Sequence, residues 1–166
     1  SEDILFIPNI PDLTPFSTYK KKGHGKFTVG FFGVVRYFDQ LKMLLEVASE
    51  TNINVIIAGF SEINNEIEEI CNQMDNAKYL GKFNYDKDIA FLYGQCDCVF
   101  SVYDANMKNV RVALPNKLYE AIYCELPIIV AKNTYLSKLV QDMGVGIAVS
   151  HKKKDELKEA LMKLST

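Results

Sequence analysis

A short stretch in the second half of the chain combines a helix start with a lysine and a glutamate one turn apart. Residues 114–120 read LPNKLYE. Pro115 suits the first position of a helix, where its missing N–H has no intrahelical partner. The next amides, those of Asn116 and Lys117, are then unpaired donors at the positive end of the helix dipole, where phosphate groups bind readily. Lys117 adds a cation at this end, and Glu120 lies one turn further on the same side.

This arrangement suits a nucleotide with a diphosphate group, because the amides and the ammonium would bind phosphate oxygens while the carboxylate accepts hydrogen bonds from ribose hydroxyls. A structural interpretation stands beside it. Lys117 and Glu120 would then be a surface ion pair that stabilises the helix by about 0.2–0.5 kcal/mol, and Pro115 would only start the helix. These residues alone favour neither interpretation.

Apolar stretches alternate with amphipathic ones along the rest of the chain. We expect buried strands at residues 27–33, 53–58, 77–80, 98–102, 127–131 and 146–149, and helices at residues 37–49, 61–74, 86–93, 115–124, 134–142 and 153–165. Continuous apolar runs are typical of parallel strands that are buried on both faces. Strands that alternate with helices predict an α/β fold: a three-layer α/β/α, Rossmann-like open parallel sheet of about six strands.

The N-terminal part of the chain differs from the rest. Residues 3–8 predict a short strand, and the stretch from there to residue 26 reads as a linker or surface loop, because prolines and a glycine interrupt it. We therefore expect an N-terminal strand and linker over residues 1–26 and a single Rossmann-like domain over residues 27–166, a length that allows one full core.

Composition and charge exclude several classes of function. The net charge is −2 and the pI about 5.7, so no strong basic field favours nucleic acid. No apolar run approaches the ~20 residues that a membrane span needs. The cysteines, Cys71, Cys96, Cys98 and Cys124, do not form the C-x-x-C pairs of a zinc site, and we expect small core residues in a reducing compartment. No metal-binding or histidine-based catalytic pattern is visible.

Candidate ligand residues follow the expected strands, because ligands of open parallel sheets bind beyond the carboxyl ends of the strands. Gly33 would let a ligand approach the backbone, and Arg36 beyond it could bind a diphosphate with its planar guanidinium. The loop after the third strand reads Gly81-Lys82-Phe83-Asn84-Tyr85. Phe83 and Tyr85 could shelter a base there, although aromatic residues in loops are more often hydrophobic anchors. Arg111, in the polar loop before the LPNKLYE helix, could contact a sugar or phosphate.

These signals, taken in order, resemble the C-terminal, nucleotide-sugar-binding domain of a GT-B glycosyltransferase, in the large group of retaining enzymes called glycosyl transferases group 1, or family-4-like. The stretches that carry the resemblance are Ile7–Asn9, Val29–Gly33, Leu41–Ala48, Val55–Gly59, Tyr79–Phe83, Leu92–Asp97, Pro115–Ala121, Leu126–Ile129 and Gly144–Gly146. Pro115–Ala121 is the most specific of them, and together they cover nearly the whole chain. The resemblance implies one half of a GT-B fold.

The resemblance also implies roles for individual residues. The amides of Asn116 and Lys117 would bind the donor diphosphate, Glu120 would bind the ribose hydroxyls, and the Gly81–Tyr85 loop would bind the base. Arg36 and Lys117 would stabilise the diphosphate as it leaves, with no metal ion or other cofactor. The expected substrate-binding residues are Gly33, Gly81, Lys82, Phe83, Tyr85, Arg111, Pro115, Asn116 and Glu120.

Three positions depart from the family pattern. Val112 stands where the family commonly has a glutamate that contacts the donor sugar, eight positions before Glu120. Asp39 lies near the position of the usual lysine after the first strand, and Glu125 replaces the usual glycine before Leu126. The sugar, the base and the acceptor therefore stay open.

The parent enzyme would transfer a sugar from a nucleotide-diphosphate donor to a glycan or another acceptor, with retention, and we expect a role in bacterial surface polysaccharide synthesis. Such enzymes need an N-terminal acceptor domain, which this chain is too short to encode, and the closing helix expected after Thr166 is also missing. We therefore expect a donor domain that is inactive alone and cytoplasmic. Its partner would be a nucleotide-sugar donor and not nucleic acid, with inner-membrane contact only through the absent domain.

Two other functions fit parts of the sequence, and a third lacks the residues it needs. Nucleotide-sugar 2-epimerases share the same two-domain architecture and would share the diphosphate and ribose contacts. A non-catalytic binding domain would keep the fold and tolerate Val112. A phospho-receiver domain needs an acidic cluster at the end of the first strand, and Phe31-Phe32-Gly33 has no acidic pair beside it.

Overall fold

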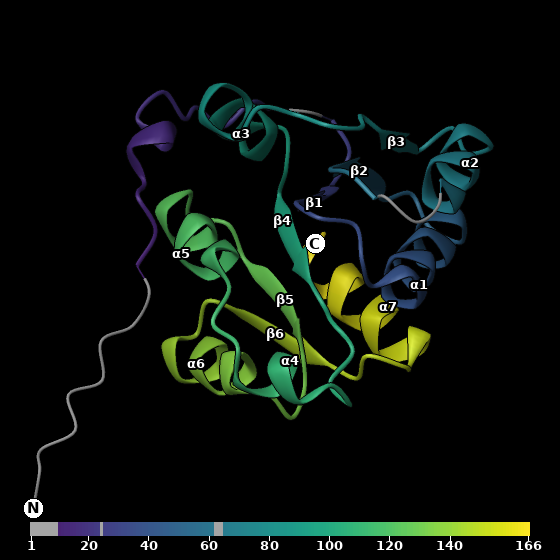
Figure 1. Ribbon diagram of the computed structural model, residues 1–166. Helices are drawn as coiled ribbons and strands as arrows, with labels where there is room; N and C mark the ends of the chain where they lie inside the picture. The colour runs from purple at the N-terminus through teal and green to yellow at the C-terminus, as the bar shows by residue number, and fades with distance from the viewer. Residues whose placement is uncertain (1–9, 24, 62–64) are drawn as a thin grey trace, which may run out of the picture.

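The structure is a computed structural model that describes residues 10–23, 25–61 and 65–166. The strand expected at residues 3–8 and the Ile7–Asn9 stretch lie outside these residues. Within them, the strands of one parallel sheet are β1 (Thr28–Phe32), β2 (Asn54–Ala58), β3 (Ala77–Tyr79), β4 (Cys98–Ser101), β5 (Ile128–Ala131) and β6 (Gly146–Val149). Their order is β3-β2-β1-β4-β5-β6 (Figure 1). The predicted Rossmann-like sheet of six parallel strands is confirmed.

The central strands are buried on both faces of the sheet. Every residue of β1, β4 and β5 is buried, which explains why their sequences are continuous apolar runs without polar alternation. β1 and β4 are neighbours although β2 and β3 separate them in the sequence, so the strand order reverses between these two strands. The loops that follow β1 and β4 leave the sheet in opposite directions, which opens the switch point where ligands of such sheets bind.

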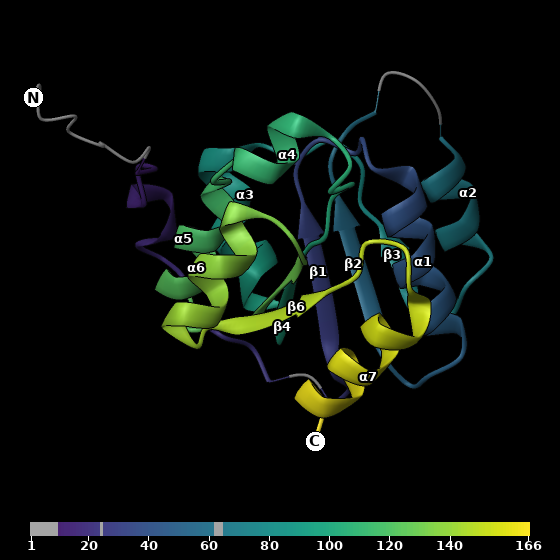
Figure 2. The same cartoon turned by 90° about the horizontal axis from the view of Figure 1, so that it is seen from below.

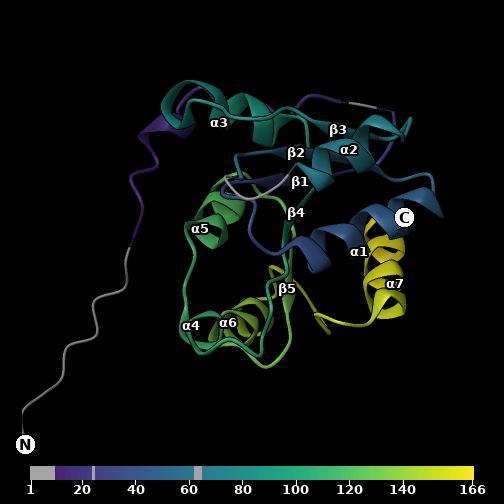
Figure 3. The ribbon, with the colours of Figure 1, turned by 45° about the vertical axis from the view of Figure 1, so that its right-hand side comes forward.

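Helices cover both faces of the sheet. One layer contains α1 (Phe38–Ser49), α2 (Glu66–Asn72) and α7 (Lys154–Leu164); the other contains α3 (Tyr85–Gly94), α5 (Asn116–Tyr123), α6 (Tyr135–Met143) and the 3-10 turn η1 (Thr14–Phe16). Figure 2 shows the two layers on opposite sides of the strands. The short helix α4 (Lys108–Val112) lies beside α6 (Figure 3). No helix in the described part of the chain is long and apolar enough to span a membrane.

Three local predictions were wrong. α2 begins at Glu66 and not at Ser61, and the loop expected to be irregular before α5 contains α4. Both elements are short, so their sequences carry too few turns for a clear helical period. Pro115 is the N-cap of α5, with an extended backbone, and not its first helical residue. The carbonyl of Pro115 accepts the amide of Leu118 at 3.2 Å, so the helix still starts where predicted, within one residue.

The segment before β1 is tied to the domain more closely than a surface linker would be. Phe16 is buried in η1, and its ring packs edge-on against the ring of Tyr93, with 5.2 Å between the centroids. The Tyr19 hydroxyl donates a hydrogen bond to the carbonyl of Cys124 at 3.0 Å. These contacts fasten the segment to α3 and to the end of α5. The cysteines are all buried and free, which confirms their prediction as core residues.

Candidate functional site

The loops after β1, β2 and β3 are joined by hydrogen bonds into a rim along the carboxyl edge of the sheet. The Gly33 amide donates to the carbonyl of Ala58 (3.0 Å), and the Gly59 amide donates to the carbonyl of Gly81 (2.8 Å). The Tyr79 hydroxyl donates to the carbonyl of Gly59 (2.9 Å). Only glycine fits at position 59, because a Cβ atom there would lie 1.7 Å from the carbonyl oxygen of Gly33. Two predicted site residues, Gly33 and Gly81, thus belong to one continuous rim.

Lys117, on the first turn of α5, reaches over the end of β1 toward this rim. A Cβ atom built on Gly33 would lie 2.8 Å from the Lys117 Nζ atom, and that Nζ lies 5.1 Å from the centroid of the Phe31 ring. The amides of Asn116 and Lys117 donate no hydrogen bond to any residue that the structure describes. An ammonium group and helix amides therefore lie together at the positive end of the α5 dipole, next to a turn that carries no side chain.

Glu120 is buried (3% exposed), and both of its carboxylate oxygens accept hydrogen bonds from tyrosine hydroxyls. The Tyr85 hydroxyl donates to Oε1 at 2.5 Å, and the Tyr93 hydroxyl donates to Oε2 at 2.5 Å. A buried carboxylate needs such donors, because a charge in the interior is costly without partners. The structural alternative, a surface ion pair between Lys117 and Glu120, is wrong, since Glu120 faces α3 and not the solvent.

Burial and the Glu120 charge keep both tyrosines protonated. Burial raises the pKa of Tyr93 well above its usual value, and the neighbouring Glu120 carboxylate raises it further. Burial, followed by the hydrogen bond to Glu120, raises the pKa of Tyr85 in the same direction. Both hydroxyls therefore act as hydrogen-bond donors over the whole neutral range, as their geometry toward the carboxylate requires.

Four other predicted residues lie along the same edge of the sheet. Arg36 is exposed in the loop between β1 and α1, and Arg111 is exposed in the last turn of α4. The Lys82 Nζ atom lies 5.5 Å from the centroid of an aromatic ring in the loop after β2. Phe83 packs against the core beside α3, as a hydrophobic anchor does. The structure thus brings the rim and Lys117 together and leaves the two arginines as exposed charges at the border.

Sequence reasoning missed two aromatic residues of this region, Tyr93 and Phe16. Tyr93 lies in the last turn of α3 and Tyr85 in its first turn, so both hydroxyls reach Glu120 from one helix. The Phe16 ring packs against both tyrosine rings, at centroid distances of 5.2 Å to Tyr93 and 6.4 Å to Tyr85. Two tyrosines on one helix were a signal available in the sequence, whereas nothing local indicates the contact with Phe16.

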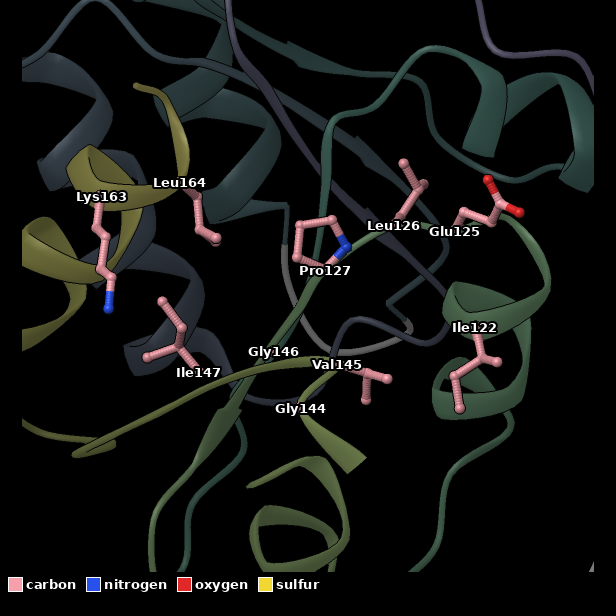
Figure 4. A pocket seen from close by; sticks show the side chains of 10 residues that line it. All are labelled: Ile122, Glu125, Leu126, Pro127, Gly144, Val145, Gly146, Ile147, Lys163 and Leu164. Carbon is pink, nitrogen blue, oxygen red and sulfur yellow. The ribbon is translucent and has the colours of Figure 1, made fainter. Parts of the chain in front are cut away.

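A cavity of about 450 Å³ lies away from this site, at the opposite edge of the sheet, where β5 and β6 begin and α7 ends (Figure 4). Its wall is mostly apolar and includes Pro127, Gly146 and Leu164. Beside Pro115, a cavity of about 10 Å³ is lined by Ser101, whose buried hydroxyl has no hydrogen-bond partner among the described residues. That volume is close to what one water molecule needs. We therefore assign the candidate site from its converging polar groups and not from a large cavity.

Comparison with known proteins shows that this chain is similar to glycosyltransferases. The family model described as "Glycosyl transferases group 1" matches residues 17–166. HepE from Anabaena, solved in complex with UDP and glucose, is a similar structure with 18% sequence identity and a TM-score of 0.65 over 84% of this chain. WaaG, a glycosyltransferase involved in lipopolysaccharide biosynthesis, has 14% identity and a TM-score of 0.70 over 95% of this chain. A comparison with curated protein sequences found no match.

A structure of a different class of enzyme is also similar. UDP-GlcNAc 2-epimerase from Neisseria meningitidis, solved with UDP-GlcNAc, has 13% identity and a TM-score of 0.58 over 84% of this chain. At these identities the structures show a shared fold. The matched region covers 40% of the HepE chain, 45% of the WaaG chain and 35% of the epimerase chain, so this chain corresponds to less than half of each.

Proposed function

The chain belongs to the family of glycosyl transferases group 1, and on that premise we propose that it is the domain that binds the nucleotide-diphosphate sugar donor. The observation that carries the proposal is the Lys117 ammonium, which lies at the start of α5 against the turn at Gly33. Helix amides, a lysine and accessible backbone are the groups that bind a diphosphate. HepE, which shares the fold, was solved with UDP and glucose.

In the proposed complex, the diphosphate lies across the amino end of α5. The amides of Asn116 and Lys117 and the Lys117 ammonium bind its oxygens, and Arg36 approaches from the loop after β1. During transfer, the bond between the sugar and the diphosphate breaks and negative charge grows on the leaving phosphate oxygen, so donors aimed there stabilise the transition state. Loss of one such charge-assisted hydrogen bond would cost about 1.5–3 kcal/mol. No metal ion or other cofactor enters this proposal.

The nucleoside half of the donor lies further along the rim, toward α3. Glu120 accepts hydrogen bonds from the ribose, the Gly81–Tyr85 loop shelters the base, and Arg111 reaches the sugar or a phosphate from α4. Val112, which is 74% exposed on α4, offers no carboxylate to the sugar. Selection of the sugar therefore depends on groups other than the side chain at this position.

We propose that the full-length protein transfers the sugar to a glycan or another acceptor, with retention, in bacterial surface polysaccharide synthesis. A second domain supplies the acceptor site and any membrane contact, so this domain alone binds donor without turnover. WaaG, one of the similar structures, is involved in lipopolysaccharide biosynthesis. The free, buried cysteines favour a reducing compartment, and we place the protein in the cytoplasm.

Calorimetric titration of the domain with a panel of nucleoside diphosphates and their sugars tests the proposal. We expect dissociation constants in the high-micromolar to millimolar range. Lys117→Met keeps the apolar stem and removes the charge, and it should weaken binding by about tenfold to 100-fold. Lys163→Met, on α7 beside the cavity at the opposite edge, is the matched control and should bind like the wild type. Equal affinities for all three proteins would overturn the proposal.

Isomerisation is the second candidate function, because UDP-GlcNAc 2-epimerase shares the fold. Incubation of the full-length protein with a nucleotide sugar and no acceptor separates the two activities. A transferase leaves the configuration of the nucleotide sugar unchanged under these conditions. Accumulation of an epimerised nucleotide sugar would show that the protein is an isomerase and not a transferase. The proposed donor-binding site would still stand in that case.

A further inference from the structure

The two tyrosines that bind Glu120 differ in their surroundings. Tyr93 is fully buried, and its ring packs against those of Phe16 and Phe32 at centroid distances of 5.2 and 5.3 Å. Its hydroxyl can leave Oε2 only if this aromatic cluster opens. Tyr85 is 37% exposed and is the first residue of α3, directly after the rim loop. Its hydroxyl can leave Oε1 by rotation of one partly exposed side chain.

Oε1 of Glu120 needs a hydrogen-bond donor whether or not a nucleotide is bound. A buried carboxylate oxygen without a donor is costly, and the Tyr85 hydroxyl satisfies Oε1 in the structure. A ribose hydroxyl offers the same group, a single O–H donor. Glu120 is only 3% exposed, so a ribose reaches its carboxylate only after a side chain that covers it has moved. Of the two tyrosines that bind Glu120, Tyr93 is fully buried and Tyr85 is 37% exposed, so Tyr85 is the one that can move more readily.

We propose that the Tyr85 hydroxyl occupies the position of a ribose hydroxyl. It donates a hydrogen bond to Glu120 in the empty domain and moves away when a ribonucleotide binds. The inference rests on the proposed function, because it names a competitor for the ribose at the donor site. Tyr93 keeps its bond to Oε2 throughout and so fixes the orientation of the carboxylate. Binding exchanges one hydrogen bond for another at Oε1, so the ribose contact adds little net affinity and the diphosphate provides most of it.

Tyr85→Phe removes the competing hydroxyl and keeps the aromatic ring. We expect this variant to bind UDP about threefold to tenfold more tightly than the wild type in a calorimetric titration. A 2′,3′-dideoxynucleoside diphosphate with the same base has no ribose hydroxyls and should bind both proteins equally. Tyr135→Phe is the matched control, because Tyr135 also begins a helix and is 39% exposed; it should bind UDP like the wild type.

Each other outcome of this titration contradicts the inference. Weaker UDP binding by Tyr85→Phe would mean that the hydroxyl contacts the nucleotide directly. Equal UDP affinities would mean that the hydroxyl and the ribose do not compete, and the proposed function would stand. If neither protein binds UDP or any other nucleoside diphosphate, the proposed function itself fails.

A second measurement uses the wild-type protein and does not depend on how the variant folds. The carbon NMR signal of the Tyr85 Cζ atom reports the hydrogen bond of its hydroxyl. Both ligands bring the same base to the Gly81–Tyr85 loop, so the lost hydrogen bond is measured by the difference between them: UDP should shift this signal more than the dideoxynucleotide does. An unchanged signal at saturating UDP would overturn the inference.

Discussion

The two halves of the candidate site lie on adjacent turns of α5 and are built in opposite ways. The phosphate half, Lys117 beside Gly33, lies at the border of the protein and has open donors. The ribose half, Glu120 with Tyr85 and Tyr93, is internal and is satisfied by the protein's own hydroxyls. A buried charge must have partners in every state, whereas a cation near solvent needs none. We infer that the phosphate half provides affinity and the ribose half provides stability.

The largest expected effect is the loss of stability when the ribose half is removed. Glu120→Ala leaves two tyrosine hydroxyls without their acceptor and opens a cavity, so the free energy of unfolding should fall by about 2–4 kcal/mol. Lys117→Ala, one turn earlier on the same helix, should cost less than about 1 kcal/mol, the size of a contact between an ammonium and an aromatic ring. Urea unfolding measures both variants. Similar losses of unfolding free energy in the two variants would contradict the claim that only the ribose half stabilises the fold.

The next effect separates the two tyrosines. Tyr93→Phe removes a buried hydrogen bond to a carboxylate and should lower the free energy of unfolding by about 1.5–3 kcal/mol. Tyr85→Phe should cost at most about 1 kcal/mol, because water can reach the partly exposed position and replace the lost donor. Urea unfolding of both variants checks the order. A larger loss for Tyr85→Phe would contradict the assignment of Tyr93 as the permanent partner.

Alkaline pH should lower the stability of the fold in part through Tyr93, which belongs to the ribose half. The pKa of Tyr93 is raised by folding, so its contribution to stability is complete below the unfolded value near 10 and is lost as the pH rises toward the folded pKa. In that window the folded protein keeps a proton that the unfolded chain releases, and the free energy of unfolding falls by about 1.4 kcal/mol per pH unit. Tyr93→Phe should remove this part of the slope.

Other groups also lower the free energy of unfolding at alkaline pH, and their contribution remains when Tyr93 is replaced. Burial raises the pKa of Cys71 to about 11 and that of Cys124 to about 12, from a usual value of 9.0, so stability begins to fall near pH 9 in the variant as well. Urea unfolding of the wild type and Tyr93→Phe across the alkaline range isolates the tyrosine. Identical slopes for the two proteins would show that Tyr93 does not titrate with unfolding.

The smallest expected effect is the response of binding to salt. The Debye length falls from about 10 Å at 0.1 M to about 3 Å at 1 M salt, so the phosphate half near solvent is screened. UDP binding should weaken by about twofold to fivefold over this range. The ratio of affinities for UDP and its dideoxy analogue reports the internal ribose half and should stay constant. A ratio that changes as much as the affinity would mean that both halves are exposed.

Part of this architecture could be predicted from local patterns. Residues 146–149 form β6 as expected, and the apolar runs of β1, β4 and β5 are continuous because both of their faces are covered. The proximity of Gly33 and Lys117 follows from topology. The turn after β1 and the loop after β4 meet where the strand order reverses, so residues far apart in the sequence lie at one edge.

The environment of Glu120 could not be predicted in the same way. The bonds from Tyr85 and Tyr93 depend on how α3 packs beside α5, and the sequence of neither helix specifies that arrangement. Phe16 lies in a stretch with turn-forming residues and reads as linker, yet its ring completes the aromatic cluster around Tyr93. Such long-range contacts follow from tertiary packing, which leaves no periodic signal in the sequence.

The most direct test of the central claim, that the donor diphosphate binds at the amino end of α5, is an NMR titration of the isotopically labelled domain with UDP. We predict that the largest amide shifts fall on Gly33, Asn116 and Lys117. The largest shifts at the opposite edge of the sheet, around Gly146 and Leu164 in the cavity of Figure 4, would contradict the claim.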